Sequence, residues 1–366
     1  MRFIERNLKH FERWLLIEYR TPRSSIEFCR VLFALYFLAV GAHDFSWVGE
    51  LPDELYYPPP GVMSAFSEFP SSGFMVGIRV AMVASAILML FGVHTAWASL
   101  GLGLGLMLSY GAAYSVGKVT HNILYVVAPI FMALIPWGPS AKKTPWRPRF
   151  WPLSVFAALF AYLMLTAAVP KLLFGWLSTD SSAVYAYAVE AQLLRDPVAP
   201  RWLTRAIPWE LVDWATIVFE FALLACLPRA SAFRAICAVS AVFHLMVFLL
   251  LDISFATNLV AYALFFDWSR PLMRLQGAEL WGAVRRARLT FRWWYAPLAA
   301  ALYVLLFPEA PLNMLLHALG VRDRVPLFAT AADLLLIVTG GLAGAAYLGY
   351  RGYVGLAGQS RAPRTG

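Results

Sequence analysis

The chain has 366 residues, of which 60% are hydrophobic and only 14% are charged. Soluble domains are usually about 45–50% apolar and about 25% charged, so this composition excludes an ordinary soluble enzyme and indicates an integral membrane protein. The formal net charge is +9, which in a soluble chain would suggest binding to nucleic acid. In a membrane protein we attribute it to arginines in the loops on one side, and we expect no nucleic-acid partner.

The first 23 residues predict an amphipathic helix lying on the membrane surface. The segment is charged throughout, and its apolar residues recur at steps of three and four, which places them on one helical face. They are Phe3, Ile4, Leu8, Phe11, Leu15 and Leu16.

Ten apolar runs follow, and we interpret each as a transmembrane helix, because about 17–25 residues are needed to cross a bilayer. The runs are residues 26–42, 74–93, 95–116, 121–137, 151–172, 209–227, 231–251, 254–268, 293–307 and 328–350. The fold class predicted is therefore all-α, a polytopic bundle of about ten transmembrane helices.

The charges of the loops predict the orientation. Six Lys or Arg residues precede Ser24, four lie in residues 138–150, six in residues 269–292 and three in the C-terminal tail. The loop at residues 43–73 instead holds five acidic residues and no Lys or Arg. Cytoplasmic loops carry the excess of Lys and Arg, so both termini are expected in the cytoplasm of a cell whose inner or plasma membrane holds the chain.

The sequence therefore predicts five segments. Residues 1–23 form the surface helix, and residues 24–268 form the main transmembrane domain. A basic cytoplasmic loop (269–292), two further transmembrane helices (293–350) and a flexible tail (351–366) follow. Within the main domain, residues 173–208 are too long and too mixed for a simple turn, and we expect one or two interfacial helices there.

Polar residues within the apolar runs are the candidate functional groups, because such groups usually face the bundle interior or a water-filled cavity. Lys171 ends the fifth run, His121 opens the fourth, and His244 lies near the outer end of the seventh. The orientation places all three in the outer half of the membrane, where we expect them to line one cavity. Each also has a structural interpretation: Lys171 can extend to the interface, and the histidines can be packing contacts.

One membrane carboxylate, the three cysteines and the absence of common catalytic motifs say less about function. Glu220 lies in the middle of the sixth run, and we expect it to pair inside the bundle, for instance with Arg30 or Arg79. The cysteines Cys29, Cys226 and Cys237 form no C-x-x-C pair and are interpreted as core residues. The sequence has no H-E-x-x-H motif, G-x-S-x-G motif or phosphate-binding loop, so we predict no metal.

Four segments, in order, resemble the membrane domain of the vitamin K-dependent γ-glutamyl carboxylase and its bacterial relatives, the horizontally transferred transmembrane (HTTM) proteins. They are "FCRVLFALYFLAVGAHD", "THNILYVVAPIFMALIPW", "AVPKLLFGW" and "VFHLMVFLLLDISFATNLVAYALFF". The family counterparts are an Arg-Phe-Leu-Phe-Gly span ending in aspartate, an Asn-His-Ser-Tyr-Leu-Tyr span, a Lys-Lys-Leu-x-x-x-Trp element and a Phe-His element. The resemblance spans residues 24–268.

The resemblance implies a lysine base on the extracytoplasmic side that deprotonates a reduced quinone, vitamin K or menaquinone-like. Oxygen then adds, and the strong base so formed drives carboxylation of a glutamate. On the matching positions Lys171 is the base, and His121 and His244 are catalytic. Asn122, Tyr125 and Trp176 lie in the same motifs and are assigned to the quinone. Apolar neighbours and any charge on the histidines would disfavour the ammonium form of Lys171, as a base requires.

The chain departs from the family pattern in two places. Pro170 stands where the family has the first lysine of its pair, and no large lumenal domain follows residue 268. The substrate is therefore left open between an exported peptide or protein, a lipid and a small molecule. Two alternatives to an enzyme remain: a transporter with an outward-facing polar cavity, and a non-catalytic membrane subunit or scaffold. A scaffold would tolerate Lys171→Met, whereas an enzyme would not. Apart from such a substrate, the partners expected are membrane lipids.

The orientation is testable by cysteine labelling in a variant without the three native cysteines. We expect a cysteine at Ser72 to react with a membrane-impermeant maleimide from outside intact cells, because residue 72 ends the acidic loop. A cysteine at Ser140, in a basic loop, is expected to react only after permeabilisation. Reaction at position 140 in intact cells would refute the orientation.

Overall fold

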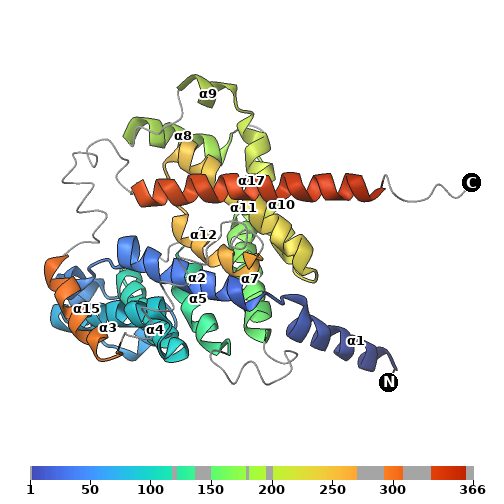
Figure 1. Cartoon of the computed structure of the whole chain (residues 1–366). Helices are drawn as coiled ribbons and strands as arrows, with labels where there is room; N and C mark the ends of the chain where they lie inside the picture. Colours follow the sequence, from blue (N-terminus) through green and yellow to red (C-terminus); the bar gives the residue numbers. More distant parts are fainter. Residues whose placement is uncertain are drawn as a thin grey trace, which may run out of the picture. The chain divides into compact units, whose positions relative to one another are not determined.

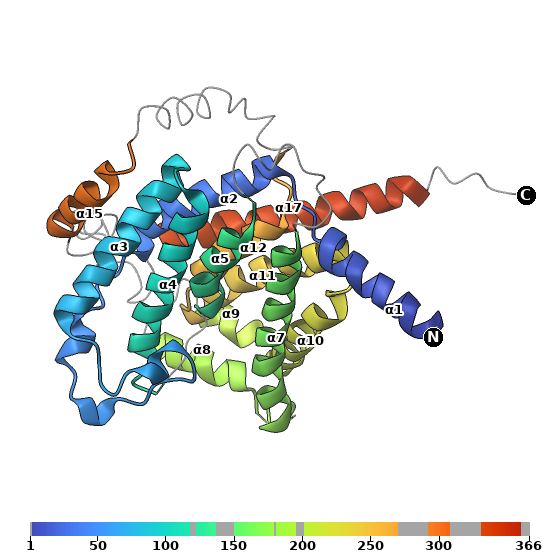
Figure 2. The same ribbon diagram turned by 90° about the horizontal axis from the view of Figure 1, so that it is seen from below.

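The computed structural model describes residues 2–117, 122–136, 150–178, 181–194, 201–269, 292–307 and 331–359. These residues form helices joined by turns (Figures 1 and 2). The one β-type contact within the described ranges is an isolated bridge between Tyr57 and Val116. The predicted all-α class is confirmed.

The chain divides into two compact units, each with its own helix packing. Unit 1 contains residues 1–156 and 260–322, and unit 2 contains residues 157–259 and 323–366. Helix α7 begins in unit 1 and ends in unit 2. The five segments expected from the sequence are not tested by this division and stay a prediction.

Unit 1 is built around α3, which packs against α2, α4 and α15, while α4 packs against α5. Figures 1 and 2 both show α3 and α4 side by side, with α15 next to α3. The elements are α1 (Arg2–Arg13), η1 (Trp14–Glu18), α2 (Arg23–Tyr36), η2 (Phe37–Gly41), η3 (Ser46–Glu50), η4 (Asp53–Leu55), η5 (Val62–Ala65), α3 (Ser72–Phe91), α4 (Thr95–Tyr114), α5 (Ile123–Leu134), η6 (Ala263–Phe265) and α15 (Tyr295–Leu306).

Buried aromatic rings form much of the unit 1 core. Tyr125 of α5 stacks on Phe33 of α2, with ring centroids 4.8 Å apart, and meets Tyr36 edge-on at 5.6 Å. Phe265 stacks on Phe156 at 5.5 Å and contacts Tyr19 at 6.1 Å. Each such pair is worth about 0.5–1.5 kcal/mol beyond the area it buries, so these rings join α2 to α5 and the start of α7 to η6.

Two buried arginines of unit 1 bind backbone carbonyl groups. Arg30 of α2 donates to the carbonyls of Met89 and Leu90 at the end of α3. Arg79 of α3 donates to Ala42, at 3.2 Å, and to Phe307, at 2.7 Å. The last carbonyls of a helix have no partner within it, and a cation there also faces the negative end of the helix dipole. Arg30 therefore completes the C-terminus of α3.

Unit 2 contains most of α7 (Trp151–Leu173), followed by α8 (Ala183–Leu194), α9 (Arg201–Ala206), α10 (Trp209–Cys226), α11 (Ala230–Leu251), the start of α12 (Ala256–Tyr262) and α17 (Ala331–Gln359). Helix α17 packs along α11, and α8 and α10 both contact α11. A Cβ atom on Gly344 of α17 would lie 2.6 Å from the carbonyl oxygen of Ala238, so glycine permits this close approach. Two helices, α8 and α9, lie in the segment where one or two interfacial helices were expected. Their position at a membrane interface stays a prediction.

Five helices in the described residues are long and apolar enough to cross a membrane, which supports the membrane character inferred from composition. They are α2 continued through η2 (Arg23–Gly41), α3, α4, α7 and α11. Helices α5 and α15 and the segment Ala256–Phe265 are apolar but shorter. The predicted count of about ten spans is not confirmed by this finding.

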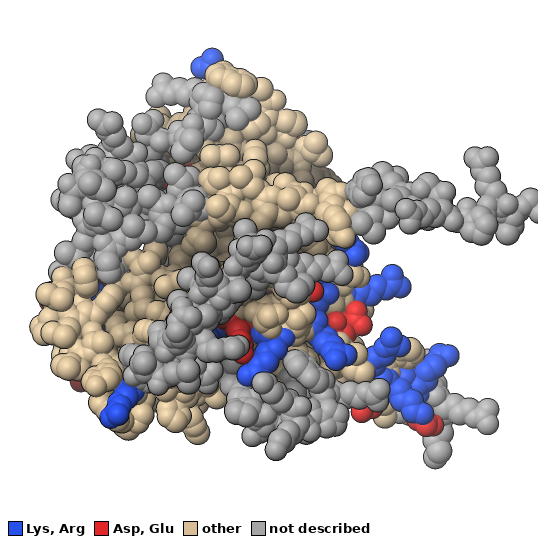
Figure 3. Space-filling model, in the orientation of Figure 1, with Lys and Arg blue, Asp and Glu red and all other residues tan. Residues whose placement is uncertain are grey.

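Charged side chains are unevenly distributed over unit 1. On the face shown in Figure 3 the blue and red residues gather over α1, at the lower right, whereas α3 and α15 show mostly uncharged surface. On α1, Leu8 and Phe11 are 61% and 58% exposed among these charges. The position of α1 on a membrane surface stays a prediction.

The contact between α2 and α3 predicts the effect of a substitution at Gly92, where α3 ends. Gly92 has φ +69°, and a Cβ atom there would lie 3.2 Å from the guanidinium carbon of Arg30. We expect Gly92→Ala to lower the free energy of unfolding by about 1–3 kcal/mol, because it adds backbone strain and displaces Arg30. The measurement is thermal unfolding in detergent.

Gly73→Ala, in the same helix, is the matched control. A Cβ atom at Gly73 meets nothing within 4 Å. Alanine is favoured over glycine in a helix, so the melting temperature is expected to stay the same or rise slightly. Equal losses from the two substitutions would contradict this account of the end of α3.

Candidate functional site

The end of α7 holds Lys171 in a turn that determines where Trp176 lies. Helix α7 ends at Leu173, and Gly175 has φ +88°, a left-handed conformation that glycine adopts readily. The backbone N–H of Trp176 then donates to the carbonyl oxygen of Lys171 at 3.3 Å. This bond is the six-to-one hydrogen bond of a Schellman motif, and it turns the chain back over the last turn of the helix.

The turn places the Trp176 ring over the Lys171 side chain. The Nζ atom of Lys171 lies 5.0 Å from the ring centroid, within the range of a cation–π contact. Lys171 and Trp176, both assigned to the site from the sequence, are therefore brought together.

Lys171 also forms an ion pair with Glu220 of α10, in which Nζ donates to Oε1. The side chains of Lys171 and Glu220 are 21% and 8% exposed, so the lysine points into unit 2. The partners expected for Glu220, Arg30 and Arg79, were wrong: both arginines bind backbone carbonyls in unit 1. Apolar runs indicate the depth of a residue but not the direction in which it faces, so the sequence did not identify this pair.

The inward position of Glu220 follows from the pattern of α10. The buried residues of this helix recur at steps of three and four and form one stripe: Trp209, Asp213, Thr216, Ile217, Glu220 and Leu223. The opposite face exposes the apolar side chains of Leu211, Trp214 and Val218. A helix with its polar groups inward and its apolar groups outward is typical of a membrane bundle. This stripe is the signal by which the sequence indicates that Glu220 faces the bundle.

Asp213, on the same stripe, fixes the start of α8. Its two carboxylate oxygens accept hydrogen bonds from the backbone N–H groups of Ala183 and Val184, each at 3.0 Å. A side-chain oxygen at a helix N-terminus satisfies N–H groups that have no partner within the helix, and a carboxylate also interacts favourably with the dipole. Asp213 thereby holds α8 against α10.

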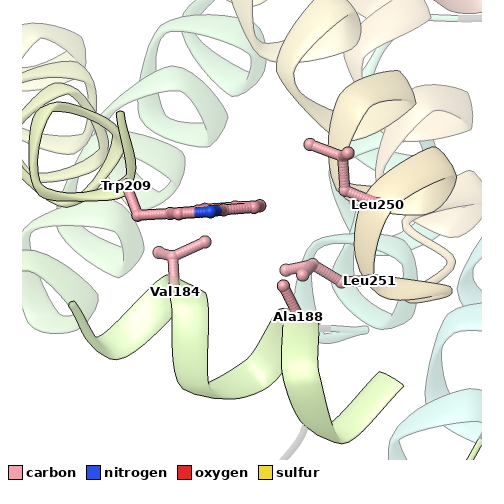
Figure 4. Packing of buried hydrophobic residues seen from close by; sticks show 5 residues of the cluster. All are labelled: Val184, Ala188, Trp209, Leu250 and Leu251. Atoms are coloured by element: carbon pink, nitrogen blue, oxygen red, sulfur yellow. The ribbon is translucent and has the colours of Figure 1, made fainter. Parts of the chain in front are cut away.

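An apolar cluster lies where α8, α10 and α11 meet, formed by Val184, Ala188, Trp209, Leu250 and Leu251. Figure 4 shows the Trp209 ring over Val184, with its far edge toward Leu250. Trp176 packs against this cluster. One residue thus contacts both the cluster and Lys171.

His244 is buried in α11 beside the connection to α12. Its ring stacks on Phe255, with centroids 4.3 Å apart and planes 12° from parallel. Phe243 and Phe219, the residues directly before His244 and Glu220, contact each other at 5.1 Å. His244 and Glu220 therefore lie at the same level of α10 and α11.

The remaining predicted site residues lie elsewhere. His121 lies outside the described residues. Asn122, partly buried, and Tyr125, stacked on Phe33, belong to unit 1, whereas Lys171, Trp176 and His244 belong to unit 2. The predicted convergence of all these residues on one cavity stays a prediction.

In the ion pair Lys171 is the hydrogen-bond donor and Glu220 is the acceptor, and Glu220 keeps one carboxylate oxygen that the pair does not use. Glu220 Oε1 accepts from Lys171, while Oε2 is buried and has no hydrogen-bond partner among the described residues. An ionised carboxylate offers about four lone-pair positions. The arrangement can therefore bind a hydroxyl group at Oε2 and place its oxygen near a cation.

A metal-binding arrangement is not found in the described part of the chain, where no three His, Cys, Asp or Glu residues group together. The three cysteines are unpaired, with Cys29 and Cys237 buried and Cys226 partly buried. These positions agree with their interpretation as core residues.

No family model matches the sequence, and no curated protein or solved structure matches the chain. The resemblance to the carboxylase membrane domain therefore stays an expectation from its four motifs.

The ion pair predicts that substitutions at Lys171 and Glu220 are coupled. Lys171→Met leaves Glu220 buried without its partner, a change that costs about 3–5 kcal/mol for a fully buried pair. We expect a smaller loss here because Lys171 is one-fifth exposed. The double variant Lys171→Met/Glu220→Leu is expected to melt higher in detergent than Lys171→Met alone, because no charge remains to be buried.

The exposed pair Lys9–Glu5 of α1 provides the control. Its side chains are 73% and 66% exposed, and such pairs contribute about 0–1 kcal/mol. Lys9→Met is therefore expected to leave the melting temperature nearly unchanged. Strictly additive losses in the double variant at positions 171 and 220 would show that the two residues do not interact.

Proposed function

We propose that this chain is a membrane enzyme that removes a proton from a lipid-soluble hydroxyl compound at Lys171. The observation that carries the proposal is the ion pair of Lys171 and Glu220, inside unit 2 and beneath the Trp176 ring. Charged residues among membrane helices are costly and are therefore usually functional. A structural pair would satisfy its oxygens, whereas Glu220 Oε2 has no partner among the described residues.

A reduced quinone of the vitamin K or menaquinone type is the co-substrate proposed from the resemblance. The residues around Lys171 suit such a molecule: Trp176 offers an aromatic face, and the pair offers a donor and an acceptor for a ring hydroxyl. Beyond Lys171, the side chains of Leu172, Leu173 and Phe174 are 45%, 68% and 79% exposed. An apolar exposed surface beside the polar pair favours a substrate that arrives through lipid.

The other assigned residues complete the proposal. His244 lies at the level of Glu220 and is proposed, with His121, to support the chemistry; Asn122 and Tyr125 are proposed to contact the quinone. When bound, the quinol supplies the reducing equivalents and the acidic hydroxyl. The product is proposed to be a modified exported peptide, lipid or small molecule.

The topology proposed is ten transmembrane helices with both termini in the cytoplasm of a plasma or inner membrane. The loop charges support this orientation, which puts Lys171 toward the extracytoplasmic side. The exposed Leu8 and Phe11 support a position of α1 on the membrane surface, where apolar side chains enter the lipid boundary.

The test is oxygen uptake by membranes that contain the full-length chain, supplied with a reduced naphthoquinone and bicarbonate. We expect Lys171→Met to lower the rate by about 10²–10⁴-fold, the usual contribution of a positioned acid or base. Lys9→Met, on the exposed surface of α1, is expected to retain the full rate.

Two results would contradict the proposal. Absence of quinol-dependent oxygen uptake by the unsubstituted chain would remove the quinol as co-substrate. A full rate in Lys171→Met would leave the scaffold interpretation, because a scaffold tolerates loss of the amine.

A further inference from the structure

The geometry points to Glu220 as the proton acceptor of this site, with Lys171 as the cation that stabilises the oxyanion left on the substrate. The inference rests on the proposed function, but it reverses the roles that the resemblance implies, in which the lysine amine is the base. It concerns a residue to which the sequence motifs assign no chemistry.

Lys171 is the hydrogen-bond donor of the ion pair, which does not suit a base. A base needs a free lone pair, and a protonated lysine has three donors and no acceptor. An adjacent carboxylate favours the charged form of a lysine. In the inferred step the pair is an ammonium–carboxylate pair, in which Nζ of Lys171 donates to Oε1 of Glu220 and has no lone pair to offer.

Glu220 has a buried carboxylate oxygen that can accept a proton. Its side chain is 8% exposed, and Oε2 is buried with no hydrogen-bond partner among the described residues. A buried acceptor without a donor is destabilising, and more so when it is charged. The chemical group that this oxygen lacks is a hydrogen-bond donor, and a substrate hydroxyl supplies one.

The surroundings define the class of ligand. The Trp176 ring lies beside the Lys171 amine. A flat aromatic side chain next to one donor and one acceptor suits a hydroxyl group on an aromatic ring, a phenol or hydroquinone. A phenol is a weaker acid than a carboxylic acid in water, so the transfer depends on a cation that stabilises the oxyanion, and Lys171 supplies that cation.

The step balances without an oxidant or reductant. The O–H bond of the ligand breaks, and its electron pair stays on the ligand oxygen. The proton forms an O–H bond with Oε2 of Glu220, while Lys171 stays an ammonium group. The pair changes from no net charge to one positive charge, opposite one negative charge on the ligand. In a water-poor site this attraction is stronger than in solution.

The test follows a phenolic probe, 1-naphthol, bound to the purified full-length chain in detergent. Two signals are read: the absorbance of naphtholate, and the infrared difference band of a protonated carboxylic acid. With the unsubstituted chain we expect naphtholate and the acid band to appear together on binding.

The variants separate the two roles. Glu220→Gln is expected to abolish the acid band and to lower the bound naphtholate by at least about tenfold, as for loss of a positioned base. Lys171→Arg keeps the positive charge but is no base near neutral pH, so both signals are expected to persist. Glu210→Gln is the control, because Glu210 is exposed on the same helix and is expected to behave as the unsubstituted chain.

Contrary results would distinguish failure of this inference from failure of the proposed function. Loss of naphtholate in Lys171→Arg with retention in Glu220→Gln would make the lysine the acceptor, overturning this inference while the proposed function stands. Absence of both signals in the unsubstituted chain would also overturn it. The proposed function fails separately, if Lys171→Met leaves oxygen uptake unchanged. If Glu220→Gln does not fold, Glu220→Asp, which keeps a carboxylate, is expected to retain the acid band, and its loss would overturn the inference.

Discussion

A charge among apolar helices needs an opposite charge or a set of hydrogen bonds, and this requirement determines how unit 2 is arranged. A lysine at membrane depth costs about 2.5–3.5 kcal/mol on insertion scales. Lys171 meets the requirement by pairing with Glu220, which joins the end of α7 to the middle of α10. Helix α10 then has to turn its polar stripe inward and its apolar face outward. Asp213, on that same stripe, in turn fixes the start of α8.

Unit 1 meets the same requirement in another way, by binding its buried arginines to backbone carbonyl groups. Arg30 and Arg79 bind carbonyl oxygens, which are neutral, abundant at helix ends and unable to take a proton. A guanidinium group has five donors in a fixed geometry and stays charged at any ordinary pH, which suits such bonds. Lys171 instead meets a carboxylate that keeps an oxygen for another donor. The residues of the proposed proton transfer, Lys171 and Glu220, therefore both belong to unit 2.

The sequence predicted the helices well because apolar runs report directly on the solvent around them. The runs at 74–93 and 231–251 correspond to Ser72–Phe91 and Ala230–Leu251. It did not identify the partner of Glu220, because Lys171 lies at the end of its run and Glu220 in the middle of another, so the two seemed to differ in depth. The position of Trp176 could have been predicted from the sequence. A glycine just after a helix predicts a Schellman motif, which places the following residue over the end of that helix.

The position of Glu220 in the middle of α10 bears on how a substrate of the proposed enzyme would reach the pair. Glu220 lies eleven residues after Trp209, the first residue of α10, a distance of about 16 Å at 1.5 Å per residue. About three turns of α10 thus precede Glu220, and they begin with Trp209 in the apolar cluster with α8 and α11 (Figure 4). Because Trp176 packs against this cluster and also over Lys171, the cluster shields the pair on that side. The exposed Leu173 and Phe174 leave an apolar approach instead, which suits a molecule dissolved in the membrane. Excluding water strengthens the interaction between an ammonium group and an oxyanion, so the same packing that limits access would also favour the proposed proton removal.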